Sequence, residues 1–161
     1  NADSLVLSED PTLEEVKAEL DSWDVNKYDE VIFCGYGEPT ERLKEVLELS
    51  RYIKAKYGKQ IRINTNGLAD LIWGERTAPW LKGIIDAVSV SLNEADAEKY
   101  LELCHPRFGL KSYDAIIDYI QDVKSYVPYV QVSAVSSAIS RESLEICRAK
   151  ARELDVNFRE R

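Results

Sequence analysis

The sequence predicts an α/β fold built on a parallel sheet. Short runs rich in β-branched residues alternate with longer segments whose apolar residues recur at helical spacing, and each run leads into such a segment. This alternation is typical of right-handed βαβ units, which form either an open doubly wound sheet or a (β/α) barrel. Both architectures place their functional sites at the carboxyl ends of the strands.

The first part of the chain predicts two helices and two strands. A helix begins in "PTLEEVKAEL", where Thr12 as N-cap and Glu15 three residues later form a capping box. The run "EVIFC" (30–34) predicts a buried strand, and "QIRINT" (60–65) predicts the second strand. Between them lies a helix with one apolar face toward the sheet. That face comprises Leu43, Val46, Leu47, Ser50, Ile53 and Tyr57.

The middle of the chain is less regular. Residues 68–83 follow Asn66-Gly67 and predict one short helix. Asn-Gly is a frequent hairpin turn, but no strand pattern follows it, so we expect a loop from strand to helix. The run "DAVSVSL" (86–92) predicts the third strand. We expect Asn93 to cap the helix of "EADAEKYLEL".

The last part of the chain repeats the strand and helix alternation. A loop, "CHPRFGL", leads to a helix whose apolar face comprises Tyr113, Ile116, Ile117, Ile120 and Val123. The run "YVQVSAV" (129–135) predicts the fourth strand. Ser140 then caps a helix that extends through Leu154, and "VNFRE" (156–160) predicts the fifth strand.

Length and charge restrict the class of protein. The 161 residues suit a single domain, 1–161, with a sizeable core. The formal net charge of −8 repels phosphate backbones and anionic membrane surfaces, and the basic residues are scattered among acidic ones. We therefore expect neither a nucleic-acid partner nor a membrane partner. The chain has no apolar run of membrane-spanning length, which favours a cytoplasmic location.

The two ends of the sequence predict a longer parent protein. The sequence contains no methionine, and we interpret Asn1-Ala2 as the remnant of a cleaved tag. A helix before the first predicted strand implies another strand upstream, so the sheet would lack its first strand. The exposed edge left by that strand predicts artefactual self-association.

Polar residues gather where the predicted strands end. Since the carboxyl ends of parallel strands share one rim, we expect these residues to converge. Strand by strand, they are Gly35, Tyr36, Gly37, Glu38 and Pro39; Asn64, Thr65, Asn66 and Gly67; Ser89, Ser91 and Asn93; and Ser133, Ser136 and Ser137.

The segment "GYGEPT" does not fit dinucleotide binding. That fingerprint needs a third glycine where Thr40 stands, and Glu38 would repel a pyrophosphate. No Gly-Lys-Ser/Thr phosphate loop occurs either. A carboxylate among exposed backbone groups instead suits a ligand that donates hydrogen bonds, such as an amino group. Without a ligand, Gly35 to Pro39 would be a simple turn.

The motifs together resemble one family. "GYGEPT" after one strand, "NTNG" at the end of the next and "VSVSLN" on the third are similar to the second, third and fourth strand motifs of radical S-adenosylmethionine (SAM) enzymes. The runs "YDEVIFCGYGEPTERL" and "DAVSVSLNEADAEKYLELCHPRFG" resemble most closely the TatD-associated radical SAM proteins. The resemblance extends over nearly the whole chain from Pro11 onward.

This resemblance implies a partial (β/α)6 TIM-like barrel that binds S-adenosylmethionine and a [4Fe-4S] cluster. Such an enzyme takes an electron from an external donor and cleaves the sulfonium to a 5′-deoxyadenosyl radical, which acts on a substrate unknown here. The resemblance implies that Gly35, Tyr36, Gly37 and Glu38 hold the amino group, largely through backbone carbonyls. Candidates for the carboxylate and ribose are Asn64, Asn66, Ser89, Ser91 and Asn93.

The cysteines depart from the family pattern. The C-x3-C-x2-C motif that holds the cluster is absent, and the three cysteines, Cys34, Cys104 and Cys147, are far apart. Their number and spacing favour reduced thiols over a disulfide framework. We therefore expect no metal site on this chain, and we expect the chain alone to be inactive.

Other functions remain open at the level of sequence. One is a noncatalytic α/β module that binds a small polar ligand at the same rim, and another is a protein-interaction domain. Ser89 and Ser91 would then be small residues that fill a crowded interior. The single histidine, His105, either acts on a substrate or is an ordinary loop residue.

Overall fold

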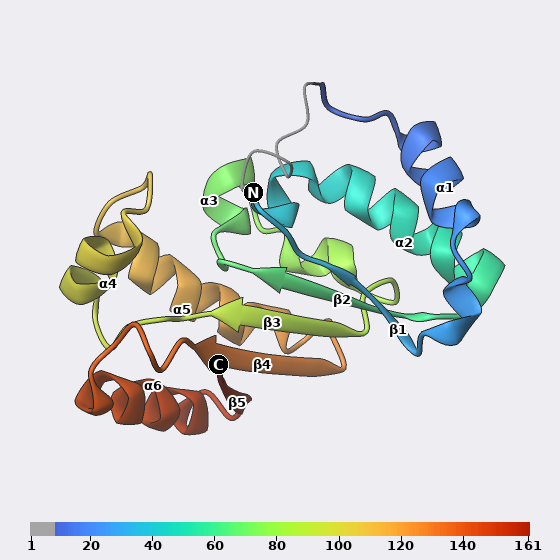
Figure 1. Ribbon diagram of the computed structural model, residues 1–161. Helices are drawn as coiled ribbons and strands as arrows, with labels where there is room; N and C mark the ends of the chain where they lie inside the picture. The colour runs from blue at the N-terminus through green and yellow to red at the C-terminus, as the bar shows by residue number, and fades with distance from the viewer. Residues whose placement is uncertain (1–8) are drawn as a thin grey trace.

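The fold is a five-stranded, fully parallel sheet with helices between successive strands, as predicted (Figure 1). The computed structural model describes residues 9–161, so the predicted tag remnant at residues 1 and 2 lies outside the described residues. The strands pair in sequence order, β1-β2-β3-β4-β5. They are β1 (Glu30–Phe33), β2 (Gln60–Thr65), β3 (Ala87–Ser91), β4 (Tyr129–Ala134) and β5 (Asn157–Glu160).

Sequential parallel pairing is the topology of part of a (β/α) barrel, because each helix returns the chain to the neighbouring position. The helices are α1 (Leu13–Ser22), α2 (Leu43–Tyr57), α3 (Ala69–Trp73), α4 (Ala97–Cys104), α5 (Lys111–Val123) and α6 (Arg141–Glu153). Three short 3-10 helices complete the set: η2 (Val25–Lys27), η3 (Pro39–Arg42) and η4 (Ala78–Leu81). No helix among residues 9–161 has the length and apolar character to cross a membrane.

The two faces of the sheet differ in chemistry. Alternate residues point to opposite faces, and on β3 Val88 and Val90 are fully buried on the face that carries the helices. Five of the six residues of the predicted apolar face of α2 are buried against that same side, and the sixth, Tyr57, is half-buried. We call the other face, which carries Ser89 and Ser91, the inner face.

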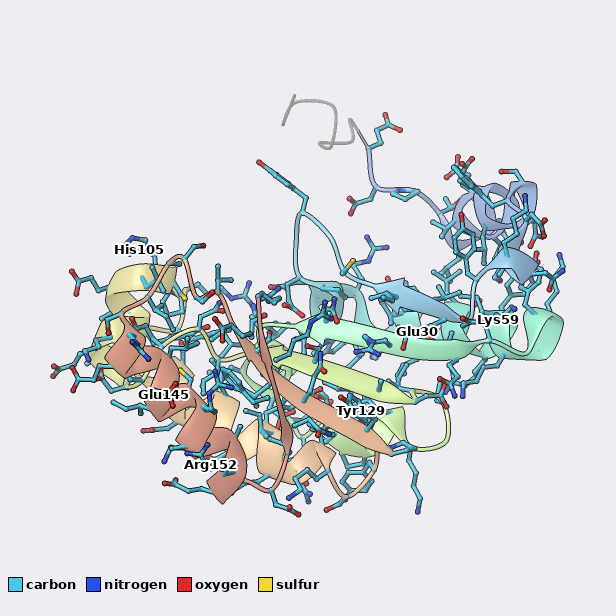
Figure 2. All side chains as sticks on the ribbon, turned by 60° about the horizontal axis from the view of Figure 1, so that its bottom comes forward. Glu30, Lys59, His105, Tyr129, Glu145 and Arg152 are labelled. Atoms are coloured by element: carbon cyan, nitrogen blue, oxygen red, sulfur yellow. The ribbon has the colours of Figure 1, made fainter. Side chains whose placement is uncertain are left out.

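The inner face is polar and partly open to solvent. Near the amino ends of the strands, Nε of Arg62 donates to both carboxylate oxygens of Glu30, at 2.9 and 3.0 Å. The Arg62 guanidinium also lies 5.8 Å from the ring centre of Tyr129. Figure 2 shows Glu30 and Tyr129 near the same end of the sheet. Ile32 and Tyr129 remain exposed there, so the sheet is not closed into a filled barrel.

The structure corrects the predicted cap of α4. Asp96, rather than Asn93, is the N-cap, because its side chain accepts a hydrogen bond from the Lys99 amide at 2.9 Å. Asn93 instead lies two residues after the end of β3 and adopts a left-handed backbone, with a φ of 60°. The helix therefore begins at Ala97, three residues later than expected. The other predicted elements agree within one or two residues at each end.

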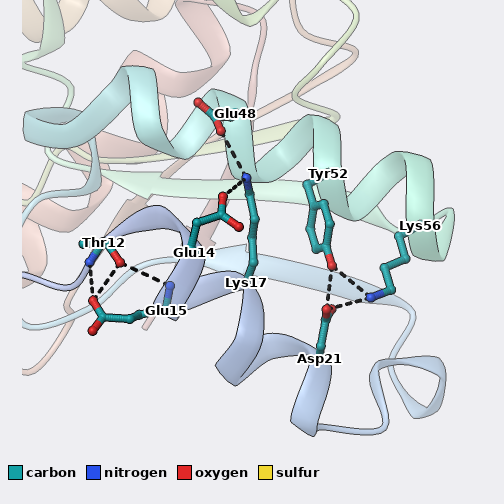
Figure 3. A network of polar contacts seen from close by, with 8 residues as sticks. All are labelled: Thr12, Glu14, Glu15, Lys17, Asp21, Glu48, Tyr52 and Lys56. Carbon is teal, nitrogen blue, oxygen red and sulfur yellow. Dashed lines mark hydrogen bonds and ion pairs between the residues drawn. The ribbon is translucent and has the colours of Figure 1, made fainter.

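Helix α1 is attached to α2 by polar contacts and buries none of its own residues (Figure 3). The predicted capping box between Thr12 and Glu15 is present. Asp21 accepts hydrogen bonds from Lys56, Tyr52 and Tyr57 of α2. These bonds, that from Lys56 most of all, lower the pKa of Asp21 to about 2.

Candidate functional site

The loop after β1 presents free backbone groups at the rim of the sheet. Within the described chain, the carbonyls of Gly35, Tyr36 and Gly37 accept no hydrogen bond from backbone or side chain. A Cβ placed on Gly35 or Gly37 would meet nothing within 4 Å, so the backbone is open to a ligand. Gly35 has a φ of 153°, and the Tyr36 side chain is 70% exposed.

The Glu38 carboxylate is turned inward and is held by four donors. Its Oε1 accepts from the Thr40 amide at 3.0 Å and from the hydroxyls of Thr40 and Thr65, each at 2.7 Å. Its Oε2 accepts from the Asn66 amide at 2.8 Å. The side chain therefore joins the end of β1 to the end of β2 and caps η3.

The turn after β2 is shaped by three consecutive residues. The Thr65 hydroxyl accepts from the Gly67 amide at 3.0 Å, and Asn66 Oδ1 accepts from the Leu68 amide at 2.9 Å. Gly67 has a φ of 79°, and an added Cβ would lie 2.8 Å from Val90 Cγ1. This is a strand-to-helix loop as predicted, and it leaves the Asn66 side-chain NH₂ without a protein partner among residues 9–161.

The strands bring several predicted residues together on the inner face. Asn64 and Ser89 are register partners, and Ser89 is in turn the partner of Gln131 on β4. Gln131 Nε2 donates to Ser89 Oγ at 2.9 Å, and both residues are buried. Gln131 was not among the residues predicted from the sequence. The sequence did contain a signal for it: Gln131 lies two residues before Ser133 on one strand, so the two side chains share a face of the sheet.

The third strand ends in two further polar contacts. Arg161 Nη2 donates to Ser91 Oγ at 3.1 Å, and Arg161 too was not among the residues predicted from the sequence. The backbone amides of Leu92 and Asn93 donate to the Ser133 carbonyl, at 3.0 and 3.4 Å. Asn93 Oδ1 is buried without a hydrogen-bond partner among the described residues. A buried unpaired carbonyl oxygen commonly indicates a missing water or ligand group.

A cavity of about 420 Å³ borders the β1 loop on its helix side. Leu13 and Val16 of α1 and Val46 and Leu49 of α2 form its apolar wall. Gly35 to Pro39 form the opposite wall, so the loop contacts this cavity as well as the rim.

Some sequence candidates lie outside the site. His105 is the C-cap of α4 and has a φ of 47°, which gives it a structural role at a helix end (Figure 2). The amide and hydroxyl of Ser136 both donate to the Arg161 carbonyl, at 2.8 and 3.1 Å.

The three cysteines are free thiols in different environments. Cys34 is exposed, Cys104 is half-buried and Cys147 is buried. Burial raises the pKa of Cys104 and raises that of Cys147 to about 11. Within residues 9–161, no group of three His, Cys, Asp or Glu side chains is arranged to hold a metal ion.

Most of the sequence matches one protein family. The model of the radical SAM superfamily matches residues 4–145. The chain belongs to the radical SAM superfamily. Among curated proteins, no sequence matches the chain significantly.

Three solved structures share the fold of this radical SAM domain. They are SuiB of Streptococcus suis (TM-score 0.67, 18% identity), the methylornithine synthase PylB (0.67, 16%) and a radical SAM methyltransferase from Sphaerobacter thermophilus (0.62, 15%). The matches cover 95%, 97% and 96% of this chain but only 34%, 45% and 48% of those chains, respectively. The domain therefore corresponds to half or less of each of these proteins.

The described residues fit one of the two cofactors that the family implies. Three free carbonyls at an open glycine loop provide acceptors for the ammonium group of S-adenosylmethionine. An iron–sulfur cluster needs thiolates that converge within bonding distance, and the described cysteines do not converge. The described residues therefore do not fit the cluster, and we derive no chemistry from a cluster held by them.

Proposed function

We propose that this domain binds S-adenosylmethionine at the carboxyl rim of its sheet and belongs to an enzyme that uses this cofactor on a substrate of unknown identity. The observation that carries the proposal is the set of free carbonyls at Gly35, Tyr36 and Gly37. Glu38 joins the loop that carries them to the end of β2. When bound together with a reduced [4Fe-4S] cluster, S-adenosylmethionine supplies a 5′-deoxyadenosyl radical.

In this proposal the chain positions and orients the cofactor. The loop carbonyls accept hydrogen bonds from the three N–H groups of the amino group. Glu38 acts as a positioning residue that keeps the loop against β2. Asn64, Asn66, Ser89, Ser91 and Asn93 supply amide and hydroxyl groups for the carboxylate and ribose. The unpaired Asn93 Oδ1 supports its assignment, since a ribose hydroxyl would satisfy it.

We further propose membership of the TatD-associated subgroup, on the motifs described above. The missing C-x3-C-x2-C motif supports the corollary that the 161-residue chain alone lacks activity. The parent enzyme would obtain its electron from an external donor.

The first test is anaerobic iron–sulfide reconstitution of the natural full-length protein. We expect bound iron and an EPR spectrum of the reduced cluster that changes when S-adenosylmethionine is added. Protein that binds no iron, or an EPR spectrum that does not change when the cofactor is added, would contradict the radical SAM function. Cofactor binding without any iron would favour the noncatalytic binding module.

A second test locates the cofactor by calorimetric titration of S-adenosylmethionine. The variant Gly37→Leu fills open space without a positive φ, so we expect an unchanged fold and a loss of binding of at least tenfold. The control is Gly58→Asn, at the C-cap of α2, where Asn tolerates the left-handed backbone. Equal affinities for wild type and Gly37→Leu would show that the ligand lies elsewhere.

A further inference from the structure

The end of β5 adds two guanidinium groups to the inner face. Arg159 is the register partner of Ser133, which is itself the partner of Ser91. Because alternate residues of a strand share a face, Arg159 and Arg161 point to the same side of the sheet as these serines. The contact between Arg161 and Ser91 agrees with that placement.

The backbone of Arg161 is fixed by the end of β4. Its amide donates to the Ala134 carbonyl at 2.9 Å, and its carbonyl accepts from Ser136. Since β4 lies between β5 and β3, the side chain must cross the inner face of β4 to reach Ser91. Only one of its five N–H donors has a partner among the described side chains, so the others are available to a ligand.

Among the residues that the structure describes, neither guanidinium has a carboxylate partner. The ion pairs within residues 9–161 include neither Arg159 nor Arg161. Glu160, between them in sequence, is paired with Arg148 of α6 on the opposite face. Two neighbouring cations repel each other, and a bound anion would offset that repulsion.

We propose that Arg159 and Arg161, with the hydroxyl of Ser133, form a binding site for an oxyanion of the substrate, either a carboxylate or a phosphate. Guanidinium groups bind both of these planar or tetrahedral oxyanions through paired N–H donors. The inference rests on the proposed function, which makes the rim the place where substrate and cofactor meet.

Distance assigns this oxyanion to the substrate rather than to the cofactor. The amino and carboxylate groups of S-adenosylmethionine are attached to one carbon atom, and the amino group is assigned to the loop after β1. Strand β5 is four strands away from β1, which corresponds to about 19 Å along the sheet. A carboxylate held beside the β1 loop therefore lies at the opposite edge of the sheet from Arg159.

The test uses inorganic phosphate and acetate as probes in calorimetric titrations of the full-length protein at low ionic strength. We compare Arg159→Gln and Arg161→Gln with a control, Arg152→Gln, which makes the same charge change. Arg152 is exposed and lies in the last turn of α6, which leads to the amino end of β5 and hence away from the rim (Figure 2). All three side chains are exposed, and circular dichroism verifies that the variants fold.

We expect wild type and the control to bind at least one probe with equal affinity. Each rim variant should bind the probe about tenfold more weakly. A tenfold loss is at the low end of the range expected when a hydrogen bond to a charged group is removed. S-adenosylmethionine binding, measured separately, should be unchanged in Arg159→Gln. Equal weakening in all three variants would overturn the proposal, since the loss of affinity would then reflect only the reduced positive charge of the protein.

Two outcomes separate this inference from the proposed function. If phosphate competes with S-adenosylmethionine and Arg159→Gln loses the cofactor, the oxyanion is the cofactor's carboxylate and the substrate assignment is wrong. If phosphate binds at the arginines but S-adenosylmethionine does not bind the protein, the proposed function fails while the oxyanion site stands.

Discussion

The Glu38 carboxylate should contribute strongly to stability, although it sits in a loop. It accepts hydrogen bonds from the hydroxyls of Thr40 and Thr65, which are 0% and 3% exposed, and from two backbone amides. Replacement by alanine leaves these donors without an acceptor and removes the cap of η3. An unsatisfied buried donor costs about 1–3 kcal/mol and a lost cap about 1 kcal/mol.

We expect Glu38→Ala to lower the free energy of unfolding by about 3 kcal/mol, because the two hydroxyls can reorient and recover part of the cost. For a domain of this size, that corresponds to a decrease in Tm of roughly 6–12 °C. Glu38→Gln keeps one acceptor oxygen but turns an NH₂ group toward a donor, so about half of that loss is expected.

The assay is urea unfolding followed by circular dichroism at neutral pH. The control is Glu41→Ala in the same 3-10 helix, where the exposed carboxylate pairs with the exposed Arg107, at 3.2 Å. Such a pair contributes about 0–1 kcal/mol. If Glu38→Ala and Glu41→Ala unfold at the same urea concentration, the inward network does not stabilise the loop and the reasoning is refuted.

Three further predictions concern separate parts of the fold. Gly67→Ala should lower the free energy of unfolding by about 2 kcal/mol or more, since its Cβ would lie 2.8 Å from Val90 at a positive φ; an unchanged urea midpoint would contradict this. The lowered pKa of Asp21 means that its bonds to α2 are complete above about pH 4 and are lost as the pH falls toward 2. The protection factors of the α1 amides, which correct for the intrinsic pH dependence of exchange, should therefore fall over that range in wild type and fall less in Asp21→Asn. A thiol reagent at neutral pH should modify the exposed Cys34 rapidly and the buried Cys147, with its raised pKa, only after unfolding; equal rates would show that the core opens readily.

Local patterns were sufficient to predict the elements of this fold. The alternation of strand and helix periods, the capping box at Thr12 and the apolar face of α2 depend on residues within one or two turns of each other. The alternation of strands and helices along the chain also predicted that the sheet is parallel and that the Asn66-Gly67 loop leads from a strand to a helix. The position of the candidate rim could also be predicted, because parallel strands bring all their carboxyl ends to one edge.

The helix boundary after β3 shows where local patterns were insufficient. Both Asn93 and Asp96 are good N-cap residues, and the sequence does not rank them. The turn at Asn93, with its φ of 60°, places Asp96 rather than Asn93 at the start of α4. That turn depends on the hydrogen bonds from Leu92 and Asn93 to the Ser133 carbonyl on the neighbouring strand.

The sequence alone therefore determined the fold class, the order of the elements and the rim at which the polar motifs meet. Only the tertiary structure decided the partners of each polar side chain: Glu38 with Thr65, Gln131 with Ser89, and Arg161 with Ser91. These pairs are 27, 42 and 70 residues apart in the chain. Such contacts depend on the register between strands and on which face each residue occupies, and both are set by the burial of the whole sheet against its helices.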